Sequence, residues 1–299
     1  MVRKIRSALI AMVIICAATP DASASGAVLK IATTTSTQSS GLLDILLPEF
    51  NRDAGIVTKV VVKGTGAAIR DGMDGNVDVI LVHAKSLEEK FVRQGYGVKR
   101  FALMHNDFVV LGPPQDPAGI KGLPDVASVF RQIAGTKACF ISRGDGSGTH
   151  IKEQEIWRAT GLALRNQSLP VEKGGPGSEF PDIRPTGADK WYISIGQGQG
   201  NAIIFADEKH AYTMVDRGTF IRYKYGMQIR LDLEILFAGD PVLYNSYGLI
   251  PINPKRFPHV QYDLARKFVD WMVSEKGQSL IKNYRLFGHQ LFSPDAIAY

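Results

Sequence analysis

The sequence predicts an α/β fold whose sheets are mainly parallel. From residue 29 onward, short apolar segments of strand length alternate with amphipathic helical segments, as is typical of this class. Several of the strands run directly into loops rich in glycine and hydroxyl side chains, and a helix follows each loop at once. The cluster of proline and glycine at Gly112–Pro117 interrupts the pattern and indicates a crossing into a second domain.

The first 24 residues are predicted to be an export signal peptide. Arg3, Lys4 and Arg6 precede an apolar run from Ala8 to Ala18, and Ala22-Ser23-Ala24 has the pattern of a cleavage site. The run is too short to span a bilayer, and no later segment approaches the roughly 20 apolar residues that spanning requires. We therefore expect a mature protein that is soluble outside the cytoplasm.

Composition indicates a compact globular protein of one large or two smaller domains, since the 299 residues are 45% hydrophobic and 21% charged. Removal of residues 1–24 lowers the formal net charge from +6 to +4 by taking away Arg3, Lys4, Arg6 and Asp21. The remaining basic residues are scattered, which argues against a nucleic-acid partner. Cys139 is then the one remaining cysteine, so no intramolecular disulfide is expected.

The first half of the chain contains four segments that are predicted to be buried strands because they are short and apolar: Leu29–Ala32, Val57–Val62, Val77–Val82 and Phe108–Leu111. Two helix faces lie between them. Leu42, Leu43, Leu46 and Phe50 form one face, and Leu87, Phe91 and Val92 form the other.

After the proline cluster, a second series of helices and strands runs through Val126–Phe130 and Lys137–Ile141. A second break lies near Phe237–Pro241 and indicates the return crossing. A long helix is expected to close the chain. Its Leu264, Phe268 and Met272 are spaced to face the core.

The loop Ser142–His150 is the strongest candidate for a binding site. It places three hydroxyls, three glycines and one guanidinium between a buried strand and a helix beginning near Ile151. The first N–H groups of a helix are unpaired and partly positive, and glycines let a ligand approach the backbone closely. The pattern indicates a small anion held with the help of Arg143, with an ion pair to Asp145 or Asp216 as the alternative role of that arginine.

Three further junctions have a similar character. Seven of the eight residues in Thr33–Ser40 carry a hydroxyl, which is more than one helix cap needs. Lys63–Gly66 precedes a short helix over Ala67–Arg70, and Ile195–Ala202 offers glycines and amides that suit either a structural turn or a ligand contact. Ligands of open α/β sheets bind beyond the carboxyl ends of the strands, so we expect the junctions to converge.

Enzyme motifs fit the chain less well. The loop lacks the Gly-x-Ser-x-Gly nucleophile turn, because residue 145 is Asp and residue 149 is Thr. Neither a Gly-x-x-x-x-Gly-Lys-Ser/Thr nucleotide loop nor a His-Glu-x-x-His metal helix occurs. A secreted hydrolase using Ser147 with His150 stays as a distant alternative, and the protein is otherwise predicted not to be an enzyme.

Taken together, these motifs resemble those of the exported tungstate-binding proteins that supply ATP-driven (ABC) oxyanion importers, which have the type II periplasmic binding protein fold. The matching stretches cover nearly all of the mature chain: Thr33–Ser36, Ser40–Asp44, Gly64–Gly66, Asp78–Ala84, Asn106–Pro113, Ser142–His150 and Ala211–Arg217.

The resemblance implies two lobes, each with a mainly parallel sheet flanked by helices, joined by two crossing segments. Lobe I would comprise residues 25–111 and 240–299, and lobe II residues 112–239, with the crossings near Phe108–Pro113 and Leu236–Tyr247. The oxyanion would lie between the lobes. Its expected contacts are Thr34, Thr35, Ser36, Thr65 and Gly66 of lobe I with Arg143, Ser147, Gly148 and Thr149 of lobe II.

The resemblance also implies the ligand and the partners. The ligand would be tungstate or molybdate, with no cofactor and no metal ion other than the tungsten of the oxyanion. The same scaffold can bind sulfate or phosphate. The partner would be an ABC transporter permease at the inner membrane, and the mature protein would be a periplasmic monomer that neither inserts into the membrane nor binds nucleic acid.

Overall fold

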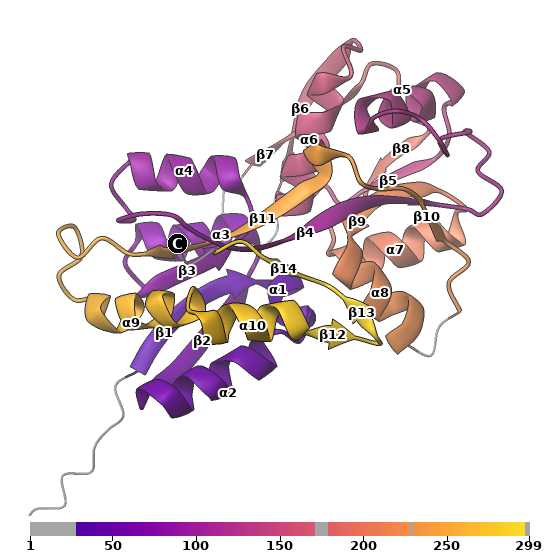
Figure 1. Cartoon of the computed structure of the whole chain (residues 1–299). Coiled ribbons are helices and arrows are strands. Elements are labelled where there is room, and N and C mark those ends of the chain that lie inside the picture. Colours follow the sequence, from indigo (N-terminus) through magenta and orange to yellow (C-terminus); the bar gives the residue numbers. More distant parts are fainter. Residues whose placement is uncertain (1–27, 171–178, 228–229, 297–299) are drawn as a thin grey trace, which may run out of the picture.

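The computed structural model describes residues 28–170, 179–227 and 230–296, which form two lobes (Figure 1). The predicted signal peptide, residues 1–24, lies outside the described residues. The elements in chain order are β1 (Val28–Thr34), α1 (Thr35–Ser39), α2 (Leu43–Ala54), β2 (Val57–Lys63), α3 (Thr65–Met73), β3 (Val79–Val82), α4 (Lys85–Arg93), β4 (Phe101–Gly112), α5 (Val126–Thr136), β5 (Phe140–Ser142), α6 (Gly148–Ala159), β6 (Leu164–Pro170), β7 (Glu179–Pro185), β8 (Tyr192–Ser194), α7 (Gln199–Glu208), β9 (Tyr212–Asp216), α8 (Arg217–Gly226), β10 (Glu234–Phe237), the 3-10 helix η1 (Pro241–Leu243), β11 (Tyr244–Pro251), α9 (Tyr262–Met272), α10 (Glu275–Asn283), β12 (Arg285–Leu286), β13 (His289–Gln290) and β14 (Ser293–Pro294).

Ten strands from both lobes join in one sheet, in the order β2-β1-β3-β11-β4-β9-β5-β8, with β10 and β14 pairing on β4. The pairs β6-β7 and β12-β13 form two separate two-stranded sheets. The outer pairs of each lobe are parallel: β1 with β2 and β3, and β5 with β8 and β9. The pairs made by β4 and β11 are antiparallel. The predicted α/β class with two lobes is confirmed, and the antiparallel pairs lie where the chain crosses between the lobes.

Strand β4 belongs to both lobes. It pairs with β11 over Phe101–Asp107 and with β9 over Phe108–Leu111. The sequence predicted a strand over the apolar residues Phe108–Leu111 alone. The strand is longer because β11 supplies hydrogen-bonding partners to the polar stretch His105–Asp107, whose composition does not indicate a strand.

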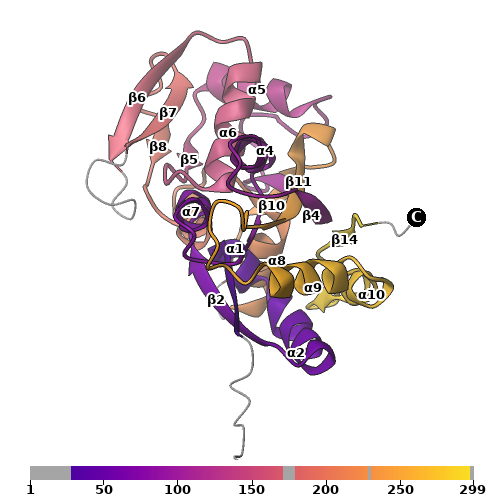
Figure 2. The same cartoon turned by 90° about the vertical axis from the view of Figure 1, so that its left-hand side faces the viewer.

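Helices cover both faces of the sheet in each lobe (Figures 1 and 2). In lobe I, one core cluster packs α2 and α9 on one face, and another packs α3 and α4 on the other. The rings of Phe50 and Phe268 meet edge to face in the first cluster, with centroids 5.0 Å apart. In lobe II, α5 and α6 cover one face, and α7 and α8 cover the other. The predicted core stripes are buried or half-buried in these clusters.

Two predictions about individual elements are wrong. Strand β2 is not buried, because it is the edge strand of the sheet, and Val57 and Val62 are 52% and 39% exposed. The closing helix is two helices: α9 ends at Met272, and Ser274 caps α10 by accepting a hydrogen bond from Gly277 N at 3.3 Å. None of the helices in the described part of the chain is both long and apolar enough to span a membrane.

Candidate oxyanion-binding site

The loop between β5 and α6 has a conformation that depends on its glycines. Gly144 and Gly146 have φ angles of +60° and +66°, a left-handed backbone that favours glycine. A Cβ atom on Gly144 would also overlap the Ser194 hydroxyl. Ser147 then caps α6, because its Oγ accepts a hydrogen bond from His150 N at 3.3 Å.

Arg143 is the second residue of the loop Ser142–His150 and is 6% exposed. Its Nη2 pairs with Asp145 Oδ2 at 2.5 Å, which is the alternative role that the sequence left open, and its Nη1 donates to Thr149 Oγ1 at 3.4 Å. Its Nε is buried and has no hydrogen-bond partner among the described residues. A buried guanidinium N–H without an acceptor is energetically costly, so Arg143 retains donor capacity for an additional anion.

Three consecutive backbone N–H groups of the loop donate hydrogen bonds within the protein. Gly146 N donates to His150 Nδ1 at 3.0 Å, and Ser147 N donates to Asp145 Oδ1 at 3.1 Å. Gly148 N donates to Thr65 Oγ1 of lobe I at 3.1 Å, so the two halves of the candidate site touch. An anion would have to compete with Thr65 for the Gly148 N–H. From the sequence, this N–H was expected to be unpaired, as the first N–H groups of a helix are.

The hydroxyls of Thr33–Ser40 divide into two groups. Thr33 and Ser40 bond to backbone carbonyls, at 2.8 Å to Leu81 O and 2.7 Å to Thr37 O, and are structural. Thr34 caps α1 by accepting from Thr37 N at 3.3 Å and lies 3.1 Å from Ser36 Oγ. Thr34 also lies 2.7 Å from Thr37 Oγ1, so the structure places the hydroxyls of Thr34, Ser36 and Thr37 together.

Thr65 is buried at the first position of α3, two residues before the predicted start of this helix. Gly66 and Thr35 are exposed in the first turns of their helices. No side-chain hydrogen bond joins either residue to the other candidate residues within the described ranges. Their predicted contacts with an anion stay predictions.

His83, which sequence reasoning missed, lies against both halves of the site and is 5% exposed. Its Nε2 is 3.0 Å from Ser36 Oγ and its Nδ1 is 3.0 Å from Asn245 Oδ1. A Cβ atom on Gly148 of lobe II would lie 3.2 Å from the ring. Burial lowers the pKa of His83 to about 4; the hydrogen bond to Asn245 opposes this shift, and the charge of Arg143 adds to it. The signal that could have found His83 is its position directly after the buried strand β3.

The junction at Ile195–Ala202 contributes Gln199, which is buried at the start of α7. Its Nε2 donates to Thr149 Oγ1, and its Oε1 accepts from Asp216 N at 3.2 Å. Gln199 thus holds in place the side chain of Thr149, which is one of the predicted anion contacts. The sequence had indicated either a structural turn or a direct ligand contact at this junction, and had not predicted this supporting role.

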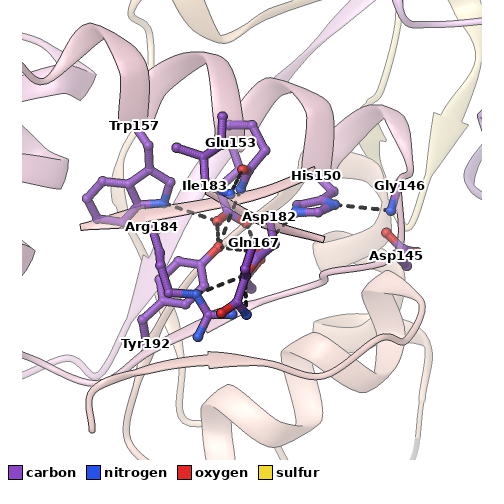
Figure 3. A network of polar contacts seen from close by, with 12 residues as sticks. Asp145, Gly146, His150, Glu153, Trp157, Gln167, Asp182, Ile183, Arg184 and Tyr192 are labelled. Atoms are coloured by element: carbon purple, nitrogen blue, oxygen red, sulfur yellow. Dashed lines mark hydrogen bonds and ion pairs between the residues drawn. The ribbon is translucent and has the colours of Figure 1, made fainter. Parts of the chain in front are cut away.

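A buried polar cluster supports the lobe II loop from behind (Figure 3). His150 Nε2 lies 3.5 Å from Asp182 Oδ1, and Asp182 also accepts from Arg184 Nε at 2.8 Å. Glu153 accepts from Ser142 Oγ at 2.8 Å and from Tyr192 Oη at 2.6 Å. Burial raises the pKa of Asp182, but the hydrogen bonds from His150 and Arg184 outweigh it and leave that pKa below its usual value.

This cluster bears on the hydrolase alternative. The ring of His150 faces Gly146 and Asp182, while the bond between His150 and Ser147 comes from the backbone N–H. The structure therefore does not form the ring-to-hydroxyl pair that activates a serine nucleophile.

A two-lobed α/β protein with hydroxyls, glycines and a buried arginine between its lobes has the architecture of a solute-binding protein. Residues 19–276 match the PBP superfamily domain. A relative named tungstate-binding protein TupA, from Peptoclostridium acidaminophilum, is 43% identical over 270 residues, which cover 89% of this chain and 85% of that protein.

Two solved structures are also similar. The tungstate-binding protein TupA from Desulfovibrio alaskensis G20 superposes with a TM-score of 0.74 and 43% identity, covering 91% of this chain and 100% of that one. A structure described as the tungstate ABC transporter from Geobacter sulfurreducens gives 0.70 and 44%, covering 86% and 98%. The chain therefore belongs to the PBP superfamily and, within it, to the family of proteins named TupA.

Proposed function

We propose that this chain is an extracytoplasmic solute-binding protein that captures tungstate between its lobes and delivers it to an ABC import permease. The names of its relatives support this ligand, and the family consists of binding proteins rather than enzymes. One observation in the structure supports it most strongly. Arg143 is buried beside the Thr149 hydroxyl, and its Nε N–H is unpartnered among the described residues.

A tetrahedral oxyanion is a ligand that suits these donors. Its four oxygens accept hydrogen bonds from several directions, and a guanidinium can give a charge-assisted bond to one of them. We assign the anion contacts to Arg143, Ser147, Gly148 and Thr149 of lobe II and to Thr34, Thr35, Ser36, Thr65 and Gly66 of lobe I. Because these residues come from both lobes, binding would favour the closed state, which the permease can distinguish from the open one.

The export of the protein, its location and its lobe boundaries are also part of the proposed function. We infer that residues 1–24 are removed on export and that the mature protein works in the periplasm as a monomer. We place the lobe boundaries at 25–111 with 240–299, and at 112–239. The pairing of β4 first with β11 and then with β9 supports a boundary near residue 108, close to the start of the second segment.

Molybdate, sulfate and phosphate are the competing ligands on this scaffold. Phosphate keeps a proton near neutral pH and needs an acceptor for it. Asp145 is the carboxylate in the loop, and its two oxygens already accept from Arg143 and Ser147 N. This pairing disfavours phosphate relative to the fully deprotonated anions. Tungstate and molybdate have nearly the same size and charge, so only a measurement ranks them.

The test is calorimetric titration of the mature protein with tungstate, molybdate, sulfate and phosphate. We expect tungstate to bind, and Arg143→Ala to weaken its affinity about 10- to 100-fold through loss of a charge-assisted contact. Arg158→Ala is the matched control, since Arg158 is exposed on α6 and should leave the affinity unchanged. Absence of binding by all four anions, or equal affinity in Arg143→Ala, would contradict the proposal.

A further inference from the structure

A chain of buried hydrogen bonds connects the crossing strands to the hydroxyl of Ser36. It begins at Asp216, the residue that caps α8, and passes to Asn106 on β4. Asn106 Oδ1 is 2.7 Å from Asn245 Nδ2 on β11, and Asn245 Oδ1 is 3.0 Å from His83 Nδ1. The last link is the 3.0 Å contact between His83 Nε2 and Ser36 Oγ. Each residue before Ser36 is 5% exposed or less.

The carboxylate fixes the direction of every bond in this chain. Asp216 Oδ1 accepts from Thr219 N at 3.1 Å, and Asp216 Oδ2 accepts from Asn106 Nδ2. The Asn106 oxygen must then accept from Asn245 Nδ2, which turns the Asn245 oxygen toward His83. Since a carbonyl oxygen only accepts, His83 Nδ1 carries the ring hydrogen.

The remaining ring nitrogen determines what Ser36 can do. In a neutral imidazole with hydrogen on Nδ1, Nε2 has only a lone pair, so the Ser36 hydroxyl donates its hydrogen to His83. An oxyanion also requires a donor. Ser36 can offer its hydrogen to the anion and still keep its bond to His83 only if Nε2 becomes the donor, which requires a protonated ring.

We propose that His83 is a positioning residue of the oxyanion site, which turns the Ser36 hydroxyl toward the anion by taking up a proton at Nε2 when the anion binds. This inference rests on the proposed function, because it assumes that an oxyanion contacts Ser36. The proton comes from solvent and is returned when the anion leaves. No covalent bond is made or broken.

The groups around His83 favour a protonation state of its ring that changes when the anion binds. The charge of Arg143 of lobe II disfavours the imidazolium. Tyr247 of β11 stacks on the ring with centroids 4.7 Å apart, and Asp216 accepts a hydrogen bond from Asn245 Nδ2 at 3.4 Å. Without an anion, burial and Arg143 keep the ring neutral and its pKa at about 4. A dianion beside Arg143 and Ser36 would reverse the sign of the local charge and raise that pKa.

The experiment is calorimetric titration of the mature protein with tungstate between pH 7 and 9, in buffers of different ionisation enthalpy. We expect uptake of a fraction of one proton per anion, largest at pH 7, and an affinity that falls by no more than about tenfold per pH unit as the pH rises. In His83→Asn, proton uptake should disappear and the affinity should become independent of pH. His210→Asn is the control, because His210 is exposed and has a φ of +47° that asparagine tolerates.

A second measurement remains valid if His83→Asn folds poorly. The nitrogen resonances of the His83 ring should report hydrogen on Nδ1 alone without tungstate at pH 7, and on both nitrogens with it. Tungstate binding without proton uptake and without a change in the ring would overturn the role of His83 and leave the proposed function intact. Absence of tungstate binding would overturn both proposals.

Discussion

The two halves of the candidate site are built from different chemistry. In lobe II, the loop after β5 is held by charges: Arg143 pairs with Asp145, and behind the loop Asp182 faces His150 and pairs with Arg184. In lobe I, Thr34 and Ser36 are held by other hydroxyls and by the neutral ring of His83.

This difference suggests a division of labour between the lobes. Buried ionic networks fix one geometry, because any displacement leaves a charge without its partner. Hydroxyls reverse their hydrogen bonds at small cost, since each can donate or accept, and the His83 ring becomes a donor at Nε2 by taking up a proton. Lobe II would therefore present a preformed charged cradle, and lobe I would adjust its donors to the anion when the lobes close.

The largest expected effect is a difference in stability between variants of two buried carboxylates, Asp182 and Asp216. Asp182→Asn leaves the buried guanidinium of Arg184 without its ion partner, and we expect a loss of about 3–5 kcal/mol in the free energy of unfolding. Asp216→Asn should cost less, about 1–3 kcal/mol, because it leaves no buried charge unpaired, although an asparagine that caps α8 turns its amide NH2 toward the Asn106 donor.

Urea unfolding of both variants measures the difference. Asp189→Asn serves as the surface control, since Asp189 pairs with Arg165 while its side chain is 61% exposed. Equal losses for Asp182→Asn and Asp216→Asn would show that the two halves are not supported differently.

Acid should loosen the lobe I half before the lobe II half. The pKa of His83 is about 4 in the folded protein against 6.5 for an ordinary histidine. The unfolded chain therefore binds a proton first, and stability falls as the pH drops from 6.5 to 4, by about 3 kcal/mol in the absence of an anion. Asp182, whose pKa is lowered, loses its contribution only below its ordinary value of 3.8. Unfolding curves of the wild type and of His83→Asn, measured between pH 4 and 6.5, test this prediction. The free energy of unfolding should fall less steeply with pH in the variant, and an equal pH dependence in both proteins would contradict the prediction.

A smaller effect compares the glycines of the two loops. Gly144→Ala should destabilise the protein by about 1–2 kcal/mol or more, because its φ is +60° and the new Cβ would overlap the Ser194 hydroxyl. Gly66→Ala has open space around it and lies in the first turn of α3, so it should be neutral or stabilise by up to about 1 kcal/mol. Thermal unfolding measures both, and a stable Gly144→Ala would show that the lobe II loop is less rigid than its contacts imply.

Local sequence patterns predicted the parts of the fold that depend on near neighbours. Apolar runs located β1, β3 and β5, and the junctions after them located most of the candidate residues, because side-chain periodicity and helix capping are short-range effects. The exposure of β2 could not be predicted, since it depends on strand order. The β6–β7 hairpin was missed because the segments that form it are largely polar and lack an alternating apolar pattern.

The candidate site, like the fold, could be predicted from local sequence patterns only in part. The loop Ser142–His150 carries its own signal, whereas the role of His83 depends on Asn245, which is 162 positions away in the chain. The choice between the two roles of Arg143 also depends on geometry. In the folded protein, Nη2 meets Asp145 while Nε stays without a partner among the described residues, and no local sequence pattern indicates either arrangement.

The strand shared by both lobes has a consequence for how the protein folds. Leu103 and Met104 of β4 lie in a core of lobe I, and Phe108 and Val110 lie in a core of lobe II. Unfolding of either lobe would remove part of the packing around β4, which also belongs to the core of the other lobe. We therefore expect the two lobes to unfold in one cooperative transition. We therefore do not expect residues 112–239 to fold on their own, because that piece would lack Phe108 and Val110 of its core.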